Sequence, residues 1–335
     1  KLLLPAVKRV LSQIHEIERS KRIINGLTRR LEELSIPTTQ FFEEEKPAGK
    51  KTDMLDEVVF VFKRGEIELP AIPSLSLKFQ ELMNRGADLR QIGELLKQDM
   101  ALSSKLISVS NSAFYRGLVE SKNVANAISR LGLKNTKRYV DAICTRSLYT
   151  TKNKRFLSLL QRLWEHSLAC AYASQILTDV MDIEIENDAF TMGLLHDIGR
   201  LLLLQIIADL QLKKKIGETI DNAELSNTVD MNHGKFGAAL LENWEFSESI
   251  MRVAAFHDNL NAADSINNDL LVVHFSNLMV KSMGFYPTEQ GDNQLQELDL
   301  ADIESARILK LDASLIEGLK TRVSEFMKEL RILFI

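Results

Sequence analysis

The chain has 335 residues, of which 26% are charged and 45% hydrophobic, and its formal net charge at pH 7 is −4. A chain of this length is expected to form about two domains and to bury enough apolar surface to fold without disulfides. Its slightly acidic balance excludes the strongly basic surface that nucleic-acid-binding domains present. We therefore expect no nucleic-acid partner.

Cysteine content and hydropathy indicate a protein of a reducing compartment. The two cysteines, Cys144 and Cys170, lie within apolar helical patterns and are expected to be buried thiols. The most apolar stretch, residues 201–210, is interrupted by Gln205 and Asp209. It is too short to cross a bilayer, which takes about 20 apolar residues. This pattern predicts a buried core helix, a cytoplasmic location and no association with membranes.

Residues 1–68 are predicted to be an N-terminal helical extension or linker. Apolar side chains recur at three- and four-residue steps over residues 1–36, which predicts one or two amphipathic helices. These helices could pack on the main body, form a coiled-coil arm or connect to an upstream sensor domain, and they are candidates for joining two copies into a homodimer. Residues 37–52 offer no apolar face and indicate an exposed linker, and a further helix is predicted over residues 53–62.

A helical lobe is predicted over residues 69–150. Pro70 and Pro73 mark an extended entry, since residues before proline avoid the α region. Asp88 and Ser121 are suited to cap the helices that follow them, and Gly132 is suited to end one. The helices predicted in this lobe cover residues 74–83, 89–98, 101–110, 123–131 and 134–149.

A charged break at residues 150–155 precedes a second helical lobe, predicted over residues 151–285. An acidic loop follows its first long helix, and Asn187 or Asp188 can cap the next one. Strand signals are few, so we predict an all-α fold. The helices predicted from here on cover residues 156–179, 189–196, 200–212, 225–231, 234–243, 247–256 and 268–283, and helices at 301–332, within the C-terminal segment 286–335, close the domain.

Five of the six histidines fall between residues 166 and 274. His166 lies in the middle of the predicted long helix, on a face that is otherwise apolar. Taken alone, a histidine in such a position is more often a hydrogen-bonded core residue than a metal ligand. His274 is interpreted as structural.

His196 and Asp197 are adjacent at the end of a short apolar helix, before Ile198 and Gly199, which we expect to break the helix. Neighbouring residues project about 100° apart within a helix. At a helix end the backbone turns, however, and both side chains can converge. A neutral imidazole and a carboxylate are suitable ligands for Fe, Mn, Ni or Zn.

Several motifs in the same order resemble a known family. The run GLLHDIGR at residues 193–200 is similar to the signature of the HD metal-dependent phosphohydrolase superfamily. The closer resemblance is to the HDOD domain, the HD-related output domain of bacterial signalling proteins, and it covers residues 69–285. The motifs that carry it are LPAIPSL at 69–75, QDMALSSKL at 98–106, NSAFY at 111–115, NAISRLG at 126–132, LWEHS at 163–167, the His-Asp run, and NHGKFGA at 232–238.

The resemblance implies an all-helical fold with two lobes and a role in bacterial signal transduction, exercised through contacts with signalling proteins. It also implies a ligand set. His166, His196 and Asp197 match the core HD positions, and His233 and His257 match two further histidine positions of metal-binding relatives. One or two divalent transition-metal ions, Fe, Mn, Ni or Zn, are therefore expected.

The chain departs from the family pattern at two positions. Family members often have a histidine pair where this chain has His257 followed by Asp258. The superfamily's final ligand is an aspartate, whereas Asn277 stands at the corresponding place, and an amide oxygen is a poorer ligand than a carboxylate. The chain also lacks the motif of the HD-GYP cyclic-dinucleotide phosphodiesterases. These departures favour a degenerate site.

Three functions are compatible with this pattern. The leading hypothesis is a non-enzymatic signalling module, with a metal in the degenerate site. The alternative is a metal-dependent phosphohydrolase acting on a nucleotide or cyclic nucleotide, with Asp197 and Lys235 as candidate catalytic residues and Arg200 as a candidate phosphate contact. The third hypothesis is a purely structural fold whose polar core residues hold no metal.

Overall fold

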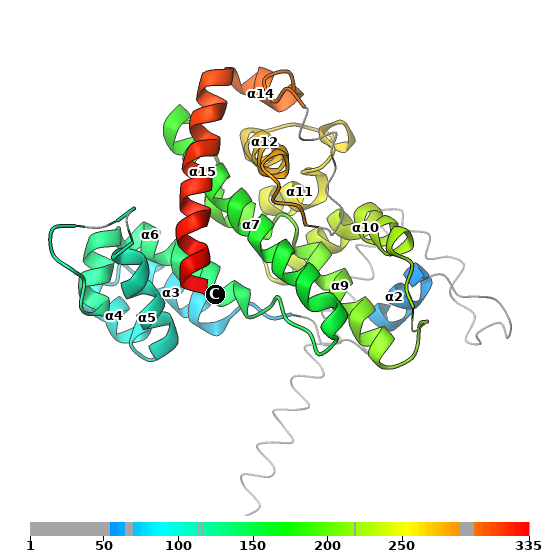
Figure 1. The fold of residues 1–335 in the computed structure, drawn as a ribbon, viewed down its shortest axis with the longest axis horizontal. Coiled ribbons are helices and arrows are strands. Elements are labelled where there is room, and N and C mark those ends of the chain that lie inside the picture. The colour runs from blue at the N-terminus through cyan, green and yellow to red at the C-terminus, as the bar shows by residue number, and fades with distance from the viewer. Residues whose placement is uncertain are drawn as a thin grey trace, which may run out of the picture. The chain divides into compact units, whose positions relative to one another are not determined.

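The structure is a computed structural model that describes residues 54–63, residues 70–287 apart from 113, 116 and 218, and residues 298–334. All regular elements in these ranges are helices, which confirms the predicted all-α class (Figure 1). The helices predicted over residues 1–36 and the linker over 37–52 lie outside the described residues. The elements are α2 (Met54–Lys63), α3 (Ser74–Asn84), α4 (Leu89–Leu96), α5 (Met100–Ser110), α6 (Val124–Arg146), α7 (Lys154–Met181), α8 (Ala189–Leu195), α9 (Ile198–Leu212), α10 (Asn222–Asn243), α11 (Glu248–Phe256), the 3₁₀ turn η1 (Leu260–Ala262), α12 (Asn268–Ser282), α14 (Glu304–Leu309) and α15 (Ala313–Phe334).

The chain divides into two compact units, and both are discontinuous in sequence. The described part of the first unit comprises residues 54–63, 70, 151–156 and 197–255. The second unit comprises the remaining described residues, and one of the points at which the chain passes from the second unit to the first is the peptide bond between His196 and Asp197. The lobe borders predicted from the sequence, at 69, 151 and 286, stay predictions.

Side-chain caps set several helix starts where the sequence predicts them. The carboxylate of Asp88 accepts from the amide of Gln91, and the side chain of Gln91 accepts in return from the amide of Asp88. Asp188 likewise accepts from the amide of Thr191 at the start of α8. These caps satisfy amides that would otherwise lack a partner in the first helical turn.

Two predicted features of α6 need correction. Asn123, rather than Ser121, caps this helix by accepting from the amide of Asn126. Gly132 does interrupt the helix, with φ of 75°, but the chain resumes helical geometry at once and the two predicted helices form one kinked element. Glycine adopts this left-handed φ without the steric cost that other residues carry.

The helix boundaries around Asp197 and Gly234 also differ from the prediction. The break in the chain falls at Asp197, the residue before α9, and both Ile198 and Gly199 are helical. The helices predicted on either side of Gly234 form the single helix α10. A Cβ on Gly234 would lie 2.7 Å from the carbonyl oxygen of Ala255, so this glycine permits a close contact and does not end the helix.

The core of the first unit is the contact of α9 with α10. Gly199 on α9 meets the backbone of α10 so closely that a Cβ there would lie 1.9 Å from the carbonyl oxygen of His233 and 2.5 Å from the amide of Gly237. Beside this contact, α2 adds an aromatic pair in which the rings of Phe62 and Phe236 are 5.4 Å apart and edge to face. The backbones of α9 and α10 are therefore in direct contact at Gly199.

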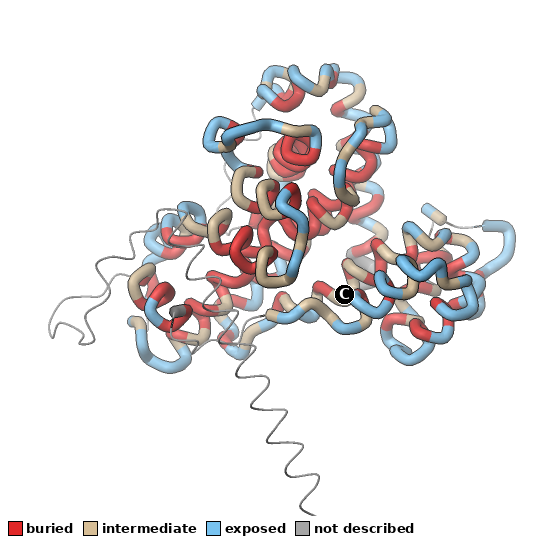
Figure 2. Tube along the Cα trace, turned by 180° about the vertical axis from the view of Figure 1, so that it is seen from behind, coloured by how far each residue is buried: buried red, intermediate tan, exposed pale blue. Residues whose placement is uncertain are grey.

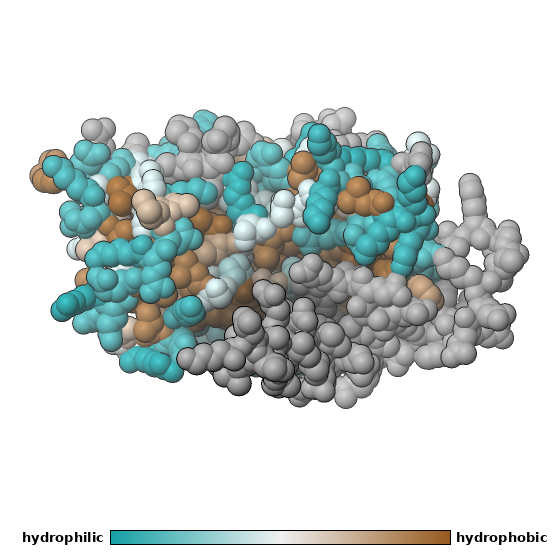
Figure 3. All heavy atoms as spheres, turned by 90° about the horizontal axis from the view of Figure 1, so that it is seen from below, coloured by the Kyte–Doolittle hydropathy of each residue, from teal (hydrophilic) through white to brown (hydrophobic). Residues whose placement is uncertain are grey.

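The core of the second unit is formed by α7, α8 and α12, and α15 packs on α5. Tyr172 of α7 stacks on Phe326 of α15 with 3.7 Å between ring centroids. Buried segments run through the inside of the described chain in Figure 2, and the face in Figure 3 carries both hydrophilic and hydrophobic side chains. Met100, on α5, is an exposed hydrophobic residue.

One helical stretch of the described residues, Ala189–Leu212, is long and apolar enough to cross a membrane by length and composition alone. It joins α8 and α9 across the break at Asp197. Of its most apolar window, 89% is buried inside the protein. This burial is that of a core helix, as the sequence predicts.

We predict that Gly199→Ala destabilises the protein by at least 2–3 kcal/mol, because the methyl group overlaps backbone atoms that cannot move independently. Urea unfolding followed by circular dichroism measures the effect. Gly318→Ala in α15 is the matched control, since nothing lies within 4 Å of its Cβ position, and alanine should gain about 0.5–1 kcal/mol there. Equal stability of the Gly199→Ala variant and the unchanged protein would contradict the packing described above.

Candidate metal centre

The five residues predicted as metal ligands are all buried, with exposed fractions from 0% for His166 and Asp197 to 5% for His233. They fall into two sets. His166, His196 and His257 belong to the second unit, and Asp197 and His233 belong to the first. In each set the potential ligand atoms approach closely: those of His166 and His196 lie within 4.8 Å of each other, and so do those of Asp197 and His233.

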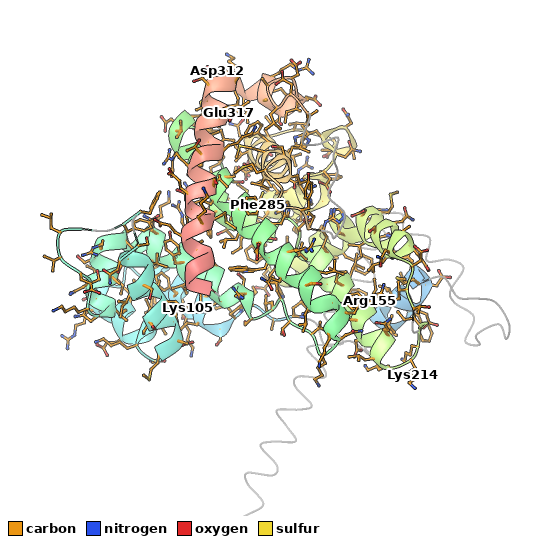
Figure 4. All side chains as sticks on the ribbon, viewed as in Figure 1. Lys105, Arg155, Lys214, Phe285, Asp312 and Glu317 are labelled. Carbon is orange, nitrogen blue, oxygen red and sulfur yellow. The ribbon has the colours of Figure 1, made fainter. Side chains whose placement is uncertain are left out.

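The two histidines from α7 and the end of α8 face each other through the same ring nitrogen. Nε2 of His166 lies 3.1 Å from Nε2 of His196. Nδ1 of His166 is 2.8 Å from the carbonyl oxygen of Phe285, and Nδ1 of His196 is 2.7 Å from the carbonyl oxygen of Gly193. Figure 4 labels Phe285 beside α7. Both imidazoles are thus anchored to backbone on the far side of the ring.

These anchors determine which nitrogen carries the proton. A carbonyl oxygen only accepts, so Nδ1 of each ring must donate to it, and the lone pair of each neutral ring then lies on Nε2. His166 and His196 therefore direct two lone pairs toward one another across 3.1 Å. Such an arrangement needs a cation or a proton between the nitrogens. Histidines that bind a metal are anchored in the same way, because their second ring nitrogen nearly always donates to a carbonyl or carboxylate.

Gly193 brings His196 to this position. A Cβ on Gly193 would lie 2.6 Å from Cα of Ala171 and 2.8 Å from the carbonyl oxygen of Cys170, so α8 touches the backbone of α7 at that point. His196 is the residue that ends α8, and its ring donates back to the carbonyl of Gly193. The same glycine thus sets the spacing between two helices and the orientation of the imidazole.

His257 completes the set in the second unit. Its ring is perpendicular to that of His196, with 4.7 Å between ring centroids. The next residue, Asp258, accepts from the side-chain amide of Asn277 at 2.7 Å and from the ammonium of Lys281 at 2.8 Å. The side-chain amide of Asn277, which the family resemblance places at the final aspartate position of the superfamily, therefore donates to a carboxylate of this chain.

In the first unit, Asp197 stands at the start of α9 without capping it. Its Oδ1 accepts from Nε of Arg200 at 2.9 Å and lies 3.6 Å from Nε2 of His233. Asp230, one helical turn before His233, forms an ion pair with Nη1 of the same arginine. One guanidinium therefore pairs with two carboxylates of the same unit.

His233 resembles the other two histidines in its protonation. Its Nδ1 is 2.9 Å from the carbonyl oxygen of Asp230 and 3.2 Å from that of Val229, so it donates to the backbone of its own helix. The Nε2 lone pair then accepts from Nη2 of Arg200 at 3.4 Å. All three histidines with resolved anchors present Nε2 as the acceptor.

Other residues singled out in the sequence lie elsewhere or have other partners. Arg200 is buried within the cluster of Asp197 and Asp230 rather than exposed to a substrate. Lys235 follows His233 by two residues on α10, so its side chain projects about 200° away around the helix. The predicted catalytic roles of Asp197 and Lys235 stay predictions.

Sequence reasoning did not identify Asp230, Gly193 or the carbonyl of Phe285 as parts of the centre. Asp230 precedes His233 by three residues on α10, a spacing that places two side chains on one helix face. That spacing was the available signal. The carbonyl of Phe285 lies 119 positions from His166 in sequence, and no local pattern reports such a contact.

Comparison with known proteins identifies a family and similar folds. Residues 69–260 match the sequence profile of the HDOD domain. An uncharacterized protein of Treponema pallidum (strain Nichols) is 26% identical over 263 residues, which are 75% of this chain and 49% of that protein. The chain therefore spans about half the length of the curated relative it matches.

Solved structures show the same fold. An HDOD domain protein with unknown function from Geobacter sulfurreducens has a TM-score of 0.65 at 19% identity, covering 84% of this chain and 98% of its own. A protein of Shewanella amazonensis SB2B, whose name proposes a metal-dependent phosphohydrolase, has a TM-score of 0.59 at 20% identity, covering 81% and 98%. A protein of Marinobacter aquaeolei VT8, whose name proposes a role in signal transduction, has a TM-score of 0.56 at 16% identity, covering 92% and 65%.

His274 supplies a pH-dependent part of the stability. Its Nδ1 is 2.9 Å from the hydroxyl of Ser305 on α14, and burial lowers the pKa of His274 from 6.5 to about 4. The unfolded chain thus binds the proton at higher pH than the folded protein does. The stability contributed by the neutral ring is complete above pH 6.5 and decreases as the pH falls toward 4, by about 1.4 kcal/mol for each pH unit at most.

We expect His274→Gln to flatten this dependence, because glutamine does not titrate. Melting temperatures of both proteins at pH 7, 5.5 and 4.5 measure it, and the difference between them isolates His274 from the other histidines. An identical decline of both melting temperatures between pH 6.5 and 4.5 would contradict the assigned pKa.

Proposed function

We propose that this chain, which belongs to the HDOD domain family, is a signal-transduction module that holds a divalent transition metal in an HD-type centre and acts through contacts with other proteins. The family and the fold support the signalling role. The observation that supports a bound metal is the pair of Nε2 atoms on His166 and His196, which lie 3.1 Å apart. The Nδ1 atoms of both rings donate to backbone carbonyls.

The donor set fits a transition metal in number, chemistry and spacing. Zn–N distances of about 2.0–2.1 Å place two ligands of one tetrahedral ion roughly 3.3 Å apart, close to the observed Nε2 separation. Neutral imidazoles with a carboxylate suit Fe, Mn, Ni or Zn. In this proposal, one or two ions are held by His166, His196, Asp197, His233 and His257, and the bond between His196 and Asp197 makes the two ligand sets neighbours in the chain.

A bound ion would supply a positive charge that attracts phosphate oxygens and lowers the pKa of a water molecule. The chain's own residues determine how far such chemistry can proceed. Asn277 directs its amide N–H to Asp258, and Lys281 neutralises the same carboxylate. The position of the superfamily's final aspartate is therefore occupied by a group that cannot offer a carboxylate oxygen, which favours binding and signalling over hydrolysis.

The proposal also covers location and partners. A cytoplasmic protein with two thiols is consistent with the buried Cys170 and the half-buried Cys144. Signalling proteins are the expected partners. Homodimer formation through the helices predicted over residues 1–36 stays a prediction, because those residues lie outside the described ranges.

We predict that the purified protein contains about one or two equivalents of Fe, Mn, Ni or Zn by elemental analysis, and that His196→Ala loses most of it because the opposed Nε2 pair is gone. His274→Gln is the matched control, since His274 is buried but bonded to Ser305 instead. A metal-free protein that remains metal-free after incubation with these four ions would contradict the proposal.

Hydrolysis assays separate signalling from catalysis. With bis(p-nitrophenyl) phosphate and with cyclic nucleotides, the metal-loaded protein should show no turnover above the metal alone. If metal-stimulated hydrolysis were found, and were absent in both His196→Ala and Asp197→Ala, the metal-dependent phosphohydrolase would replace the signalling module as the function.

A further inference from the structure

Arg200 is a buried cation within the first unit's half of the proposed centre. It lies on α9, three residues after Asp197, with 5% of its surface exposed. Its guanidinium donates from Nε to Oδ1 of Asp197 at 2.9 Å, from Nη1 to Oδ1 of Asp230, and from Nη2 to Nε2 of His233 at 3.4 Å. Asp197 and His233 are residues to which the proposed function gives the role of metal ligand.

The contact with His233 excludes a metal ion from the same atom. Because Nδ1 of His233 donates to the carbonyl of Asp230 at 2.9 Å, its neutral ring has one lone pair in the ring plane, on Nε2. That lone pair accepts from Arg200. A single lone pair cannot serve an N–H donor and a metal ion at once, so Arg200 and a metal are alternative partners of His233.

Asp197 is not restricted in this way. Its carboxylate has two oxygens with about four lone-pair positions, and Arg200 uses Oδ1. The carboxylate can keep the guanidinium and still offer an oxygen to a metal. The competition is thus confined to His233, the one ligand of the first unit with a single acceptor site.

We propose that Arg200 is a built-in competitor of the metal, which withholds His233 from the ligand set until it is displaced. This inference rests on the proposed metal centre and adds that its occupancy is weakened by a cation of the chain itself. As a consequence, the affinity of the site for divalent cations is lower than the same ligands would provide without Arg200.

The surroundings of Arg200 allow such a displacement. The contact with His233, at 3.4 Å, is longer than that with Asp197, at 2.9 Å. The side chain of Asp230 is 47% exposed, so the guanidinium can keep both carboxylates while Nη2 turns away from the ring. Arginine carries five N–H groups in a rigid fork, so this change can leave both ion pairs in place.

The experiment is a calorimetric titration of the metal-free full chain with Mn²⁺, and separately with Zn²⁺. Arg200→Met removes the guanidinium and frees the Nε2 lone pair, and we expect the affinity of the site that includes His233 to rise about 10-fold, or ~1.4 kcal/mol. The gain should vanish in the double variant Arg200→Met, His233→Ala.

Lys213→Met is the matched control, because Lys213 is the C-cap residue of the same helix and pairs with Asp209 at 2.7 Å on the surface. It removes the same charge and should leave the affinity unchanged. Arg200→Lys guards against loss of folding in Arg200→Met: the ammonium keeps the charge, but its single nitrogen lacks the planar fork that reaches Asp197, Asp230 and His233 together, so a gain of a few-fold is expected. Circular dichroism establishes that each variant is folded.

The outcomes separate this inference from the proposed function. If the unchanged protein binds Mn²⁺ or Zn²⁺ and the folded Arg200 variants bind with equal or lower affinity, Arg200 positions the ligands rather than competing with the metal, and only the inference is overturned. If a gain persists without His233, the inference is also wrong. If neither the unchanged protein nor any variant binds either ion, both the proposed metal centre and the competition by Arg200 are overturned.

Discussion

The close approach of helices at two glycines is the constraint on which the candidate site depends. Gly193 lets α8 touch the backbone of α7, and Gly199 lets α9 touch the backbone of α10. The pair His196 and Asp197 lies between these glycines, at the one break in an otherwise continuous apolar helical stretch. His196 therefore lies near His166 of α7, and Asp197 lies near His233 of α10.

Backbone carbonyls then determine the chemistry of the rings. Phe285, Gly193 and Asp230 each accept a hydrogen bond from the Nδ1 atom of a buried histidine. A carbonyl cannot donate, so these contacts determine which nitrogen carries the proton in each neutral ring. All three rings present Nε2 as a lone-pair donor, which is the state that a transition metal requires.

Ion pairs lie close to these rings. Arg200 pairs with both Asp197 and Asp230 in the first unit, and Lys281 pairs with Asp258 in the second. Buried ions are tolerated when they are paired and hydrogen-bonded. The same pairing engages groups near the candidate ligands: Arg200 donates to Nε2 of His233, and Asn277 directs its amide N–H to Asp258.

Local patterns in the sequence were sufficient for the helical class, for the cap at Asp88 and for a cap at Asn187 or Asp188, because periodicity and capping act within a few residues. The selection of five polar residues, all of which are buried, came from the resemblance to the HD superfamily. They misplaced the break at Asp197 and divided α10 at Gly234, since a glycine that ends a helix and one that admits a neighbouring backbone look alike in sequence. Only the tertiary structure decided that Gly199 and Gly234 are contact points, that Arg200 is paired with Asp197 and Asp230, and that His166 donates to a carbonyl 119 positions away. Those features arise from contacts between distant helices, which no local pattern records.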